Sequence, residues 1–217
     1  MAEHKLFDGD VPHVSTPEFH RHRERAPHLE QAVHQPRLHT AARYVRTAVI
    51  EHIRGCPGSR NCIPHPVSDL GCGDGGLLSL LAREEGRIEA WGYDFQPSNQ
   101  AGWEQRGVHA HLRDVFGEER DRAVLGLTSV TTEVLEHLAD PHAAVRWIGQ
   151  HSRYLVASSP WNETSESHDE CHAWAWDQVG YRALIEQGGF TILRHETVGQ
   201  FQVVLAEQTG ATPCTSS

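Results

Sequence analysis

The spacing of apolar residues along the chain alternates between the pattern of a helix and the pattern of a strand. It therefore predicts alternating helices and strands. From His39 to Ile53 the apolar side chains fall on one helical face, which is typical of a helix that covers a sheet. After it, short apolar runs bounded by Gly, Pro or Asp predict strands. These runs are 67–70, 88–94, 108–112, 128–132, 154–157, 190–195 and 201–206. Helical patterns separate most of them, at 77–81, after Pro97, at 142–150 and at 181–187.

The order of these elements predicts an α/β fold. Strands that alternate with helices form a mostly parallel sheet with helices on both faces. The last two runs are joined only by a short segment around Gly199, so they predict an antiparallel hairpin. We therefore expect a Rossmann-like, seven-stranded, mostly parallel sheet that ends in a C-terminal antiparallel hairpin.

Length and composition place this sheet in a single domain. The 217 residues suffice for one full core, and we assign the domain to residues 39–210. Residues 1–38 are rich in His, Arg and Pro and predict an N-terminal arm that is partly helical or disordered. Residues 211–217 predict a disordered tail.

Net charge and cysteine content narrow the range of possible partners and cellular compartments. A formal charge of -10 argues against a broad nucleic-acid-binding surface, so a small-molecule substrate fits better. No apolar run is long enough for a membrane span, and the first residues lack the apolar core of a signal peptide. Five irregularly spaced cysteines suit a reducing compartment, so we expect a cytoplasmic protein. A loop with Cys56, Cys62 and His65 is either a zinc site or a plain surface loop.

The stretch VSDLGCGDGGLLSLL, residues 67–81, turns a strand into a helix through four glycines. Glycine is used where φ is positive or where a ligand approaches the backbone closely. The free amides at the start of the helix suit a carboxylate or a phosphate. Gly71, Gly73 and Gly76 match the dinucleotide fingerprint G-x-G-x-x-G, so NAD and FAD are candidate cofactors.

An acid follows this loop at a characteristic distance. Asp94 ends the second strand 23 positions after Gly71. Rossmann-type sheets place an acid against ribose hydroxyls about 20 positions after the first glycine. Strand position and spacing therefore favour ribose binding by Asp94 over a simple cap of the helix near Pro97.

The acid before the first glycine adds a family resemblance. The sequence D-L-G-C-G-D-G-G resembles motif I of class I S-adenosylmethionine (SAM) methyltransferases. The resemblance implies that Asp69, with Gly71 and Gly73, holds the loop and the methionine end of SAM. It also implies that Asp114 and Val115 contact adenine, whereas the alternative for Asp114 is a turn residue.

The segment EVLEHLADP, residues 133–141, resembles two subfamilies. These are the ubiquinone-pathway O-methyltransferases and the small-RNA 2′-O-methyltransferases that act on a 3′-terminal ribose. In both, E-x-x-E-H is associated with a divalent metal, which implies Glu133, Glu136 and His137 as ligands. In a helical turn these positions share a face. The alternative is that Glu136 and His137 line the cofactor pocket or fix a loop without a metal.

A long polar segment, SSPWNETSESHDECHAWAWD, follows the fifth strand and predicts a functional lid. Its part CHAWAW resembles the D-H-x-F-E-W stretch of the RNA-modifying subfamily, which implies His172 as a further metal ligand. The match differs at Cys171 and Ala175. The tryptophans of this segment either stack on a planar substrate or pack the lid.

Together these features predict a SAM-dependent methyltransferase that methylates an oxygen of a small molecule or metabolite. SAM is the expected cofactor, joined in the metal-dependent alternative by a divalent ion (Mn, Co, Zn or Mg). That alternative includes 2′-O-methylation of an RNA 3′-terminal ribose. Without an ion, His137 or His172 would act as the general base. An NAD-dependent oxidoreductase and a non-catalytic SAM-binding protein are the alternatives of another class.

Overall fold

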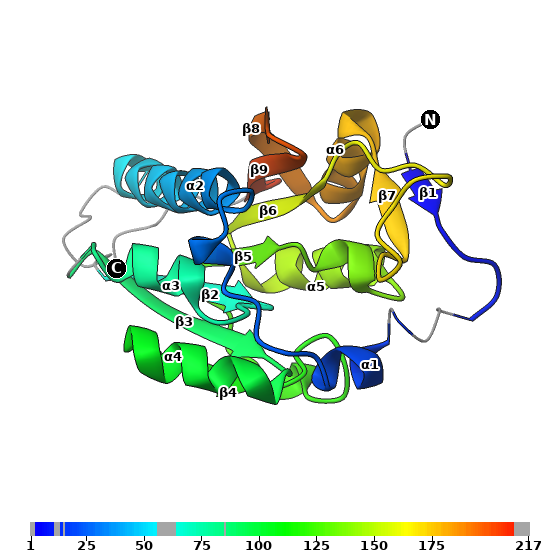
Figure 1. Cartoon of the computed structure of the whole chain (residues 1–217). Coiled ribbons are helices and arrows are strands. Elements are labelled where there is room, and N and C mark those ends of the chain that lie inside the picture. Colours follow the sequence, from blue (N-terminus) through cyan, green and yellow to red (C-terminus); the bar gives the residue numbers. More distant parts are fainter. Residues whose placement is uncertain (1–2, 11–13, 15, 56–63, 85, 211–217) are drawn as a thin grey trace.

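A seven-stranded sheet forms the centre of the computed structural model, which describes residues 3–10, 14, 16–55, 64–84 and 86–210 (Figure 1). The strand order is β4-β3-β2-β5-β6-β9-β8. The strands are β2 (His65–Leu70), β3 (Ile88–Asp94), β4 (Ala110–Leu112), β5 (Thr128–Thr132), β6 (Tyr154–Pro160), β8 (Phe190–Val198) and β9 (Phe201–Gln208).

The pairing of the strands confirms the predicted fold class. Strands β2 to β6 pair in parallel with their neighbours, whereas β9 runs antiparallel to both β6 and β8. The chain moves outward from β2 to β4 and then returns to β5 on the other side of β2. A reversal of this kind opens a crevice at the carboxyl ends of the strands, where α/β sheets bind ligands.

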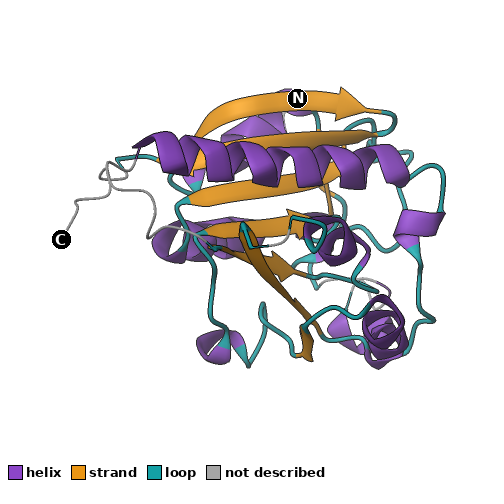
Figure 2. Ribbon diagram, turned by 90° about the vertical axis from the view of Figure 1, so that its left-hand side faces the viewer, coloured by secondary structure: helices purple, strands orange, loops and turns teal. Residues whose placement is uncertain are grey.

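Helices cover both faces of the sheet (Figure 2). One face carries α2 (Gln35–Gly55), α3 (Gly76–Leu81) and α4 (Gln100–Arg106), and the other carries α5 (Pro141–His151) and α6 (Gln178–Gln187). Neighbouring strand residues serve opposite cores because side chains alternate along a strand. In β9, Leu205 packs with the apolar residues of α2, and Val204 packs with those of α5 and α6.

The N-terminal arm is shorter than residues 1–38 and contains short elements. Helix α2 begins at Gln35, so the arm ends before residue 38. Its described parts include β1 (Glu3–Lys5), α1 (Pro17–Arg21) and the 3-10 turn η2 (His28–Glu30). Strand β1 pairs with β7 (Trp174–Trp176), which lies inside the segment predicted as a lid. In Figure 1 the blue chain descends from β1 to α1 and then crosses back to α2.

Some predicted features lie outside the described residues. These are Cys56 and Cys62 of the candidate zinc loop and the tail at 211–217. Within the described part of the chain, no helix combines the length and the apolar character that crossing a bilayer requires.

Candidate functional site

The glycine loop after β2 has the bare backbone that its sequence predicts. Gly71 has φ 80°, and a Cβ on it would lie 2.4 Å from Cγ2 of Val134. A side chain at this position would therefore clash as well as strain the backbone. The amides of Gly71 and Cys72 both donate to the carbonyl oxygen of Tyr93, at 2.8 and 3.0 Å, which ties the loop to the end of β3.

A cavity of about 550 Å³ opens beside this loop. This volume is in the ordinary range for a ligand pocket of about 300–1,000 Å³. All six residues predicted to bind the cofactor line it, from β2, β3 and the loop after β4: Asp69, Gly71, Gly73, Asp94, Asp114 and Val115. The structure thus gathers these residues around one space, although they span 47 positions of the sequence.

Asp94 fixes the loop and faces the cavity at once. Its Oδ2 accepts from the amide of Gly73 at 2.9 Å, and its Oδ1 accepts from the amide of Gln96 at 2.8 Å. Asp94 also lines the cavity, whereas the residue at the cap position of the 3-10 turn that begins at Pro97 is Gln96. Burial raises the pKa of Asp94, and the backbone amides oppose that shift.

Asp69 lies deeper in the site. Its carboxyl group is buried, and Oδ1 has no hydrogen-bond partner among the described residues. Burial raises the pKa of Asp69 to about 7; the charge of Asp94 adds to the shift and that of Arg37 opposes it. A cation at this end of the cavity would favour the ionised form of Asp69.

Arg37 is a site residue that sequence reasoning missed. Its side chain is 1% exposed and lines the cavity from the first turns of α2. Nη1 lies 3.9 Å from Oε1 of Glu133, and Nη2 lies 3.3 Å from Nδ1 of His34. Nε has no partner in the part of the chain that is described. No motif marks this arginine, because it reaches the site only through the packing of α2 on the sheet.

A second group of polar side chains, the Glu136/His137/His172 cluster, lies at the wall of this cavity. One oxygen or nitrogen from each of these three residues lies within 4.8 Å of the others. His137 lines the cavity itself, and its ring centroid is 4.7 Å from that of His172. Residues that are 35 positions apart in the sequence therefore meet at one point.

The local backbone corrects one geometric expectation. E-x-x-E-H does not form a helical turn with all three residues on one face, because only Leu135–His137 form a 3-10 turn, η6. Glu133 precedes this turn with φ 59°, a strained value for a residue with a side chain. Its carboxylate accepts from Oγ of Ser158 at 3.1 Å and stands outside the three-residue cluster.

Hydrogen bonds fix the orientation of both histidines in the cluster. Nδ1 of His137 lies 2.9 Å from the carbonyl oxygen of Cys171, and Nδ1 of His172 lies 2.7 Å from Oε2 of Glu163. Since a carbonyl and a carboxylate only accept, each Nδ1 carries a proton, and in the neutral ring Nε2 is then free to act as a ligand. This is the arrangement found around histidines that ligate metals. Glu163 is a second residue that the sequence did not single out.

Glu136 is the least satisfied group of the cluster. Its side chain is 0% exposed, and neither carboxylate oxygen has a partner among the residues that the structure describes. Burial and the nearby charge of Glu133 raise the pKa of Glu136 well above its usual range. A buried carboxyl group without partners is costly, so this position favours a cation as the missing partner.

Comparison with known proteins identifies the family of the chain. A family profile described as "Methyltransferase domain" matches residues 64–194, more than half of the chain. The chain belongs to the methyltransferase domain family. The matched range contains the glycine loop, Asp94, the Glu136/His137/His172 cluster and most of the sheet.

Curated relatives of this chain match over a shorter stretch. The trans-aconitate 2-methyltransferase of Mycobacterium sp. (strain KMS) is 35% identical over 111 residues, which cover 48% of this chain and 42% of that protein. The enzyme of Mycobacterium sp. (strain JLS) matches equally well. The chain thus spans less than half the length of these relatives.

Solved structures share the fold at low identity. Magnesium protoporphyrin IX methyltransferase from Synechocystis PCC 6803, with bound SAM, superposes with a TM-score of 0.57 at 17% identity. That match covers 82% of this chain and 85% of the other chain. Human N-acetylserotonin methyltransferase in complex with SAM superposes with a TM-score of 0.52 at 14% identity. That match covers 72% of this chain and 51% of the other chain. The [4+2]-cyclase SpnF superposes with a TM-score of 0.56 at 13% identity, over 67% of this chain and 74% of the other chain. Similarity at this level shows the fold alone.

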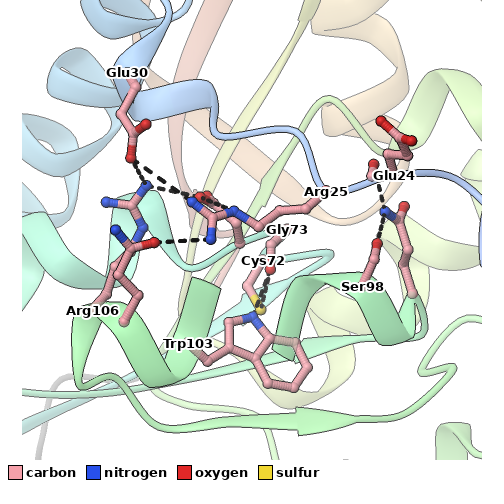
Figure 3. Close-up of polar contacts among 11 residues, drawn as sticks. Glu24, Arg25, Glu30, Cys72, Gly73, Ser98, Trp103 and Arg106 are labelled. Atoms are coloured by element: carbon pink, nitrogen blue, oxygen red, sulfur yellow. Dashed lines mark hydrogen bonds and ion pairs between the residues drawn. The ribbon is translucent and has the colours of Figure 1, made fainter. Parts of the chain in front are cut away.

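The N-terminal arm is fastened to the glycine loop by polar contacts (Figure 3). Asp74, in the loop, is 3% exposed and accepts from Nη2 of Arg106 at 2.8 Å, while Nε of Arg25 lies 3.5 Å away. Glu30 of the arm also pairs with Arg106, at 3.0 Å. From the other side, Nε2 of Gln96 donates to the carbonyl oxygens of residues 23 and 24 at 3.1 and 3.0 Å. We name this set of contacts the arm clamp.

The three tryptophans of the segment predicted as a lid contact the rest of the protein, although Trp161 is partly exposed. Trp176 is 0% exposed in the main core, and its ring is nearly parallel to that of Trp174 with the centroids 6.2 Å apart. Trp174 donates to the carbonyl oxygen of Leu138, and Trp161 to that of Gly199. These contacts support the packing alternative for the aromatic residues of the segment.

Proposed function

We propose that this protein transfers the methyl group of SAM to an oxygen of a small molecule, with a divalent ion at the Glu136/His137/His172 cluster. One observation carries the finer part of the proposal. The buried Glu136 carboxyl group has no partner among the described residues and faces two histidines whose Nδ1 atoms are already engaged. A carboxylate and two imidazoles are a ligand set that suits Mn²⁺, Co²⁺ or Zn²⁺ better than Mg²⁺.

The cavity beside the glycine loop would hold SAM. Two of the structural neighbours contain SAM, and the six residues with cofactor-like spacing surround the space here. Asp94 would bind the ribose hydroxyls, and Asp114 and Val115 the adenine. Asp69 would face the methionine ammonium group. The unpartnered Nε of Arg37 suits the methionine carboxylate, because a guanidinium binds carboxylates well.

A small acceptor fits the enclosed character of the site. The cavity is covered by the arm, and the chain is acidic overall. The mycobacterial relatives are trans-aconitate 2-methyltransferases, which is consistent with a small molecule as acceptor. The likeness of E-x-x-E-H and His172 to the RNA-modifying subfamily favours the 3′-terminal ribose of RNA as the second candidate.

Methyl transfer depends on the alignment of the acceptor oxygen with the methyl group of SAM and needs no covalent intermediate with the protein. An oxygen lone pair of the acceptor attacks the methyl carbon, the carbon–sulfur bond breaks, and the acceptor hydroxyl loses its proton. Asp94 and Asp114 would orient the cofactor, and the arm would exclude water. Glu136, His137 and His172 would hold the ion, with Glu133 beside them. When bound, such an ion lowers the pKa of a hydroxyl group and orients its oxygen.

Removal of divalent ions tests the metal centre. We expect methyl transfer from radiolabelled SAM to fall to background after treatment with a chelator and to return with Mn²⁺ or Co²⁺. The assay is run on fractionated small molecules and, in parallel, on an RNA with a free 3′-terminal ribose. If transfer is unchanged by the chelator, His137 acts as a general base instead, a contribution of about 10²–10⁴-fold.

Replacement of Asp94 tests the cofactor site. We expect Asp94→Ala to weaken SAM binding at least tenfold in calorimetry, since each charged hydrogen bond contributes about 1.5–3 kcal/mol. Asp94→Asn, which keeps one acceptor oxygen for the glycine loop, separates loss of ribose contacts from loss of loop order. Asp121→Ala, an exposed acid away from the cavity, is the control. Tight binding of NAD in place of SAM would contradict the assignment.

A further inference from the structure

Three imidazole rings stand in a row at the wall of the cavity. His20, from the short helix α1 of the arm, lies edge-on to His137 with 4.9 Å between ring centroids. His137 lies edge-on to His172 at 4.7 Å. His20 and His137 both line the cavity. The arm therefore brings a third histidine to the cluster from 117 positions away in the sequence.

The position of His20 is held by the arm clamp. Just after α1, the carbonyl oxygen of Arg23 accepts from Oγ of Ser98 at 2.9 Å and from Nε2 of Gln96 at 3.1 Å. Arg25 then reaches Asp74 in the glycine loop. These contacts fix the segment directly after His20 to the loops after β2 and β3, which carry the cofactor residues.

Hydrogen bonding assigns the proton on the His20 ring. Nη1 of Arg23 lies 3.4 Å from Nδ1 of His20. A guanidinium only donates, so Nδ1 accepts and Nε2 carries the hydrogen of the neutral ring. That Nε2 is buried and has no partner among the residues that the structure describes. His20 thus differs from His137 and His172, whose Nδ1 atoms carry the proton.

The two kinds of imidazole imply different tasks. His137 and His172 offer lone pairs, as metal ligands do, whereas His20 offers a hydrogen. Among the described residues, His20 does not belong to the group of ligand atoms that lie within 4.8 Å of one another. His20 lines the cavity beside that group, so its donor lies near the place where an acceptor oxygen would be bound.

We propose that His20 is an acceptor-binding residue, whose Nε2–H donates a hydrogen bond to an acceptor oxygen beside the Glu136/His137/His172 cluster. This inference rests on the proposed function, because it needs an oxygen acceptor at that point. The hydrogen bond would hold the oxygen in place and stabilise the negative charge that it gains as its proton leaves. The arm would then recognise the acceptor as well as cover the cofactor.

The test uses the full chain with S-adenosylhomocysteine, the demethylated cofactor, and catechol as an oxygen-donor probe. Binding of Mn²⁺, of the cofactor product and of catechol is measured by calorimetry for four proteins: the wild type, His20→Leu, His20→Gln and His22→Leu. The side-chain amide of glutamine places an N–H near the position of Nε2. His22 is an exposed arm histidine that pairs with Glu18 and is the matched control.

We expect His20→Leu to weaken the binding of catechol at least tenfold, which corresponds to about 1.4 kcal/mol of binding free energy. Its affinity for Mn²⁺ and for S-adenosylhomocysteine should stay unchanged. The affinity of His20→Gln for catechol should stay within threefold of the wild-type affinity. The affinity of His22→Leu for catechol should equal that of the wild type. Unchanged catechol binding by His20→Leu would overturn the proposal, and so would an equal loss for all three ligands, which would indicate a structural role.

The same titrations separate this inference from the proposed metal centre. If the wild type does not bind Mn²⁺, the metal centre is wrong, but the comparison of His20 variants with catechol still decides the role of the donor. If the wild type binds Mn²⁺ but no catechol, the metal centre stands and the assignment of His20 to the acceptor is overturned.

Discussion

Replacement of Glu136 by leucine is expected to stabilise the ion-free protein by about 1–3 kcal/mol and to abolish the binding of Mn²⁺ or Co²⁺. The gain arises because the wild type buries a carboxyl group that has no partner in the described part of the chain. A leucine of similar volume removes that cost. Urea unfolding with a chelator present gives the free energy of unfolding, and titration with Mn²⁺ gives the binding.

Glu133 provides the matched control for this prediction. It is also an acid of E-x-x-E-H, but it contacts Ser158 and lies close to the buried Arg37. We expect Glu133→Leu to lower the free energy of unfolding, because it leaves a buried guanidinium without its counter-charge. A loss of stability in Glu136→Leu comparable to that in Glu133→Leu would show that Glu136 has a stabilising role in the ion-free protein.

Replacement of Asp74 by alanine is expected to lower the free energy of unfolding by about 3 kcal/mol, the low end for a broken buried ion pair, because Arg106 then keeps, among the described residues, only its contact with the exposed Glu30. Asp74 is 3% exposed and Arg106 is largely buried, so water screens their contact poorly. The change also detaches Arg25 and so loosens the arm. Urea unfolding measures the first effect, and the dissociation rate of SAM measures the second.

An exposed ion pair of the same arm serves as the control. Glu18 pairs with Arg21 and His22 at the surface, and such pairs contribute about 0–1 kcal/mol. We expect Glu18→Ala to change the free energy of unfolding little and the dissociation of SAM not at all. If Asp74→Ala behaves like Glu18→Ala in both measurements, the arm clamp does not hold the arm.

Local patterns in the sequence were enough to predict the sheet and a set of residues that line one cavity. Glycines, an acid and apolar runs occur at fixed spacings there, because a strand, a turn and a helix follow each other directly in the chain. The backbone at Glu133 and the single turn at η6 were not predictable in this way. E-x-x-E-H fits a helix equally well, and only the packing of Leu135 in the core selects the 3-10 turn.

Contacts between distant segments explain what the sequence did not predict. Arg37, Glu163 and His20 belong to no spacing pattern and reach the site through tertiary packing. The pairing of β1 with β7 joins residues that are about 170 positions apart, and neither strand has more than three residues. Such short strands carry no periodic signal, so their partner determines whether they form.

The arm clamp also bears on the rate of methyl transfer in the proposed function. Because the arm lies along the cavity and is tied to the glycine loop, S-adenosylhomocysteine bound there would leave by that side only after the arm lifts. Lifting breaks the contacts of Arg25 with Asp74, of Glu30 with Arg106 and of Gln96 with the arm backbone, which makes it slow compared with the opening of an unattached loop. Turnover at saturating substrate would then be set by product release, and the first catalytic cycle would run faster than all later ones.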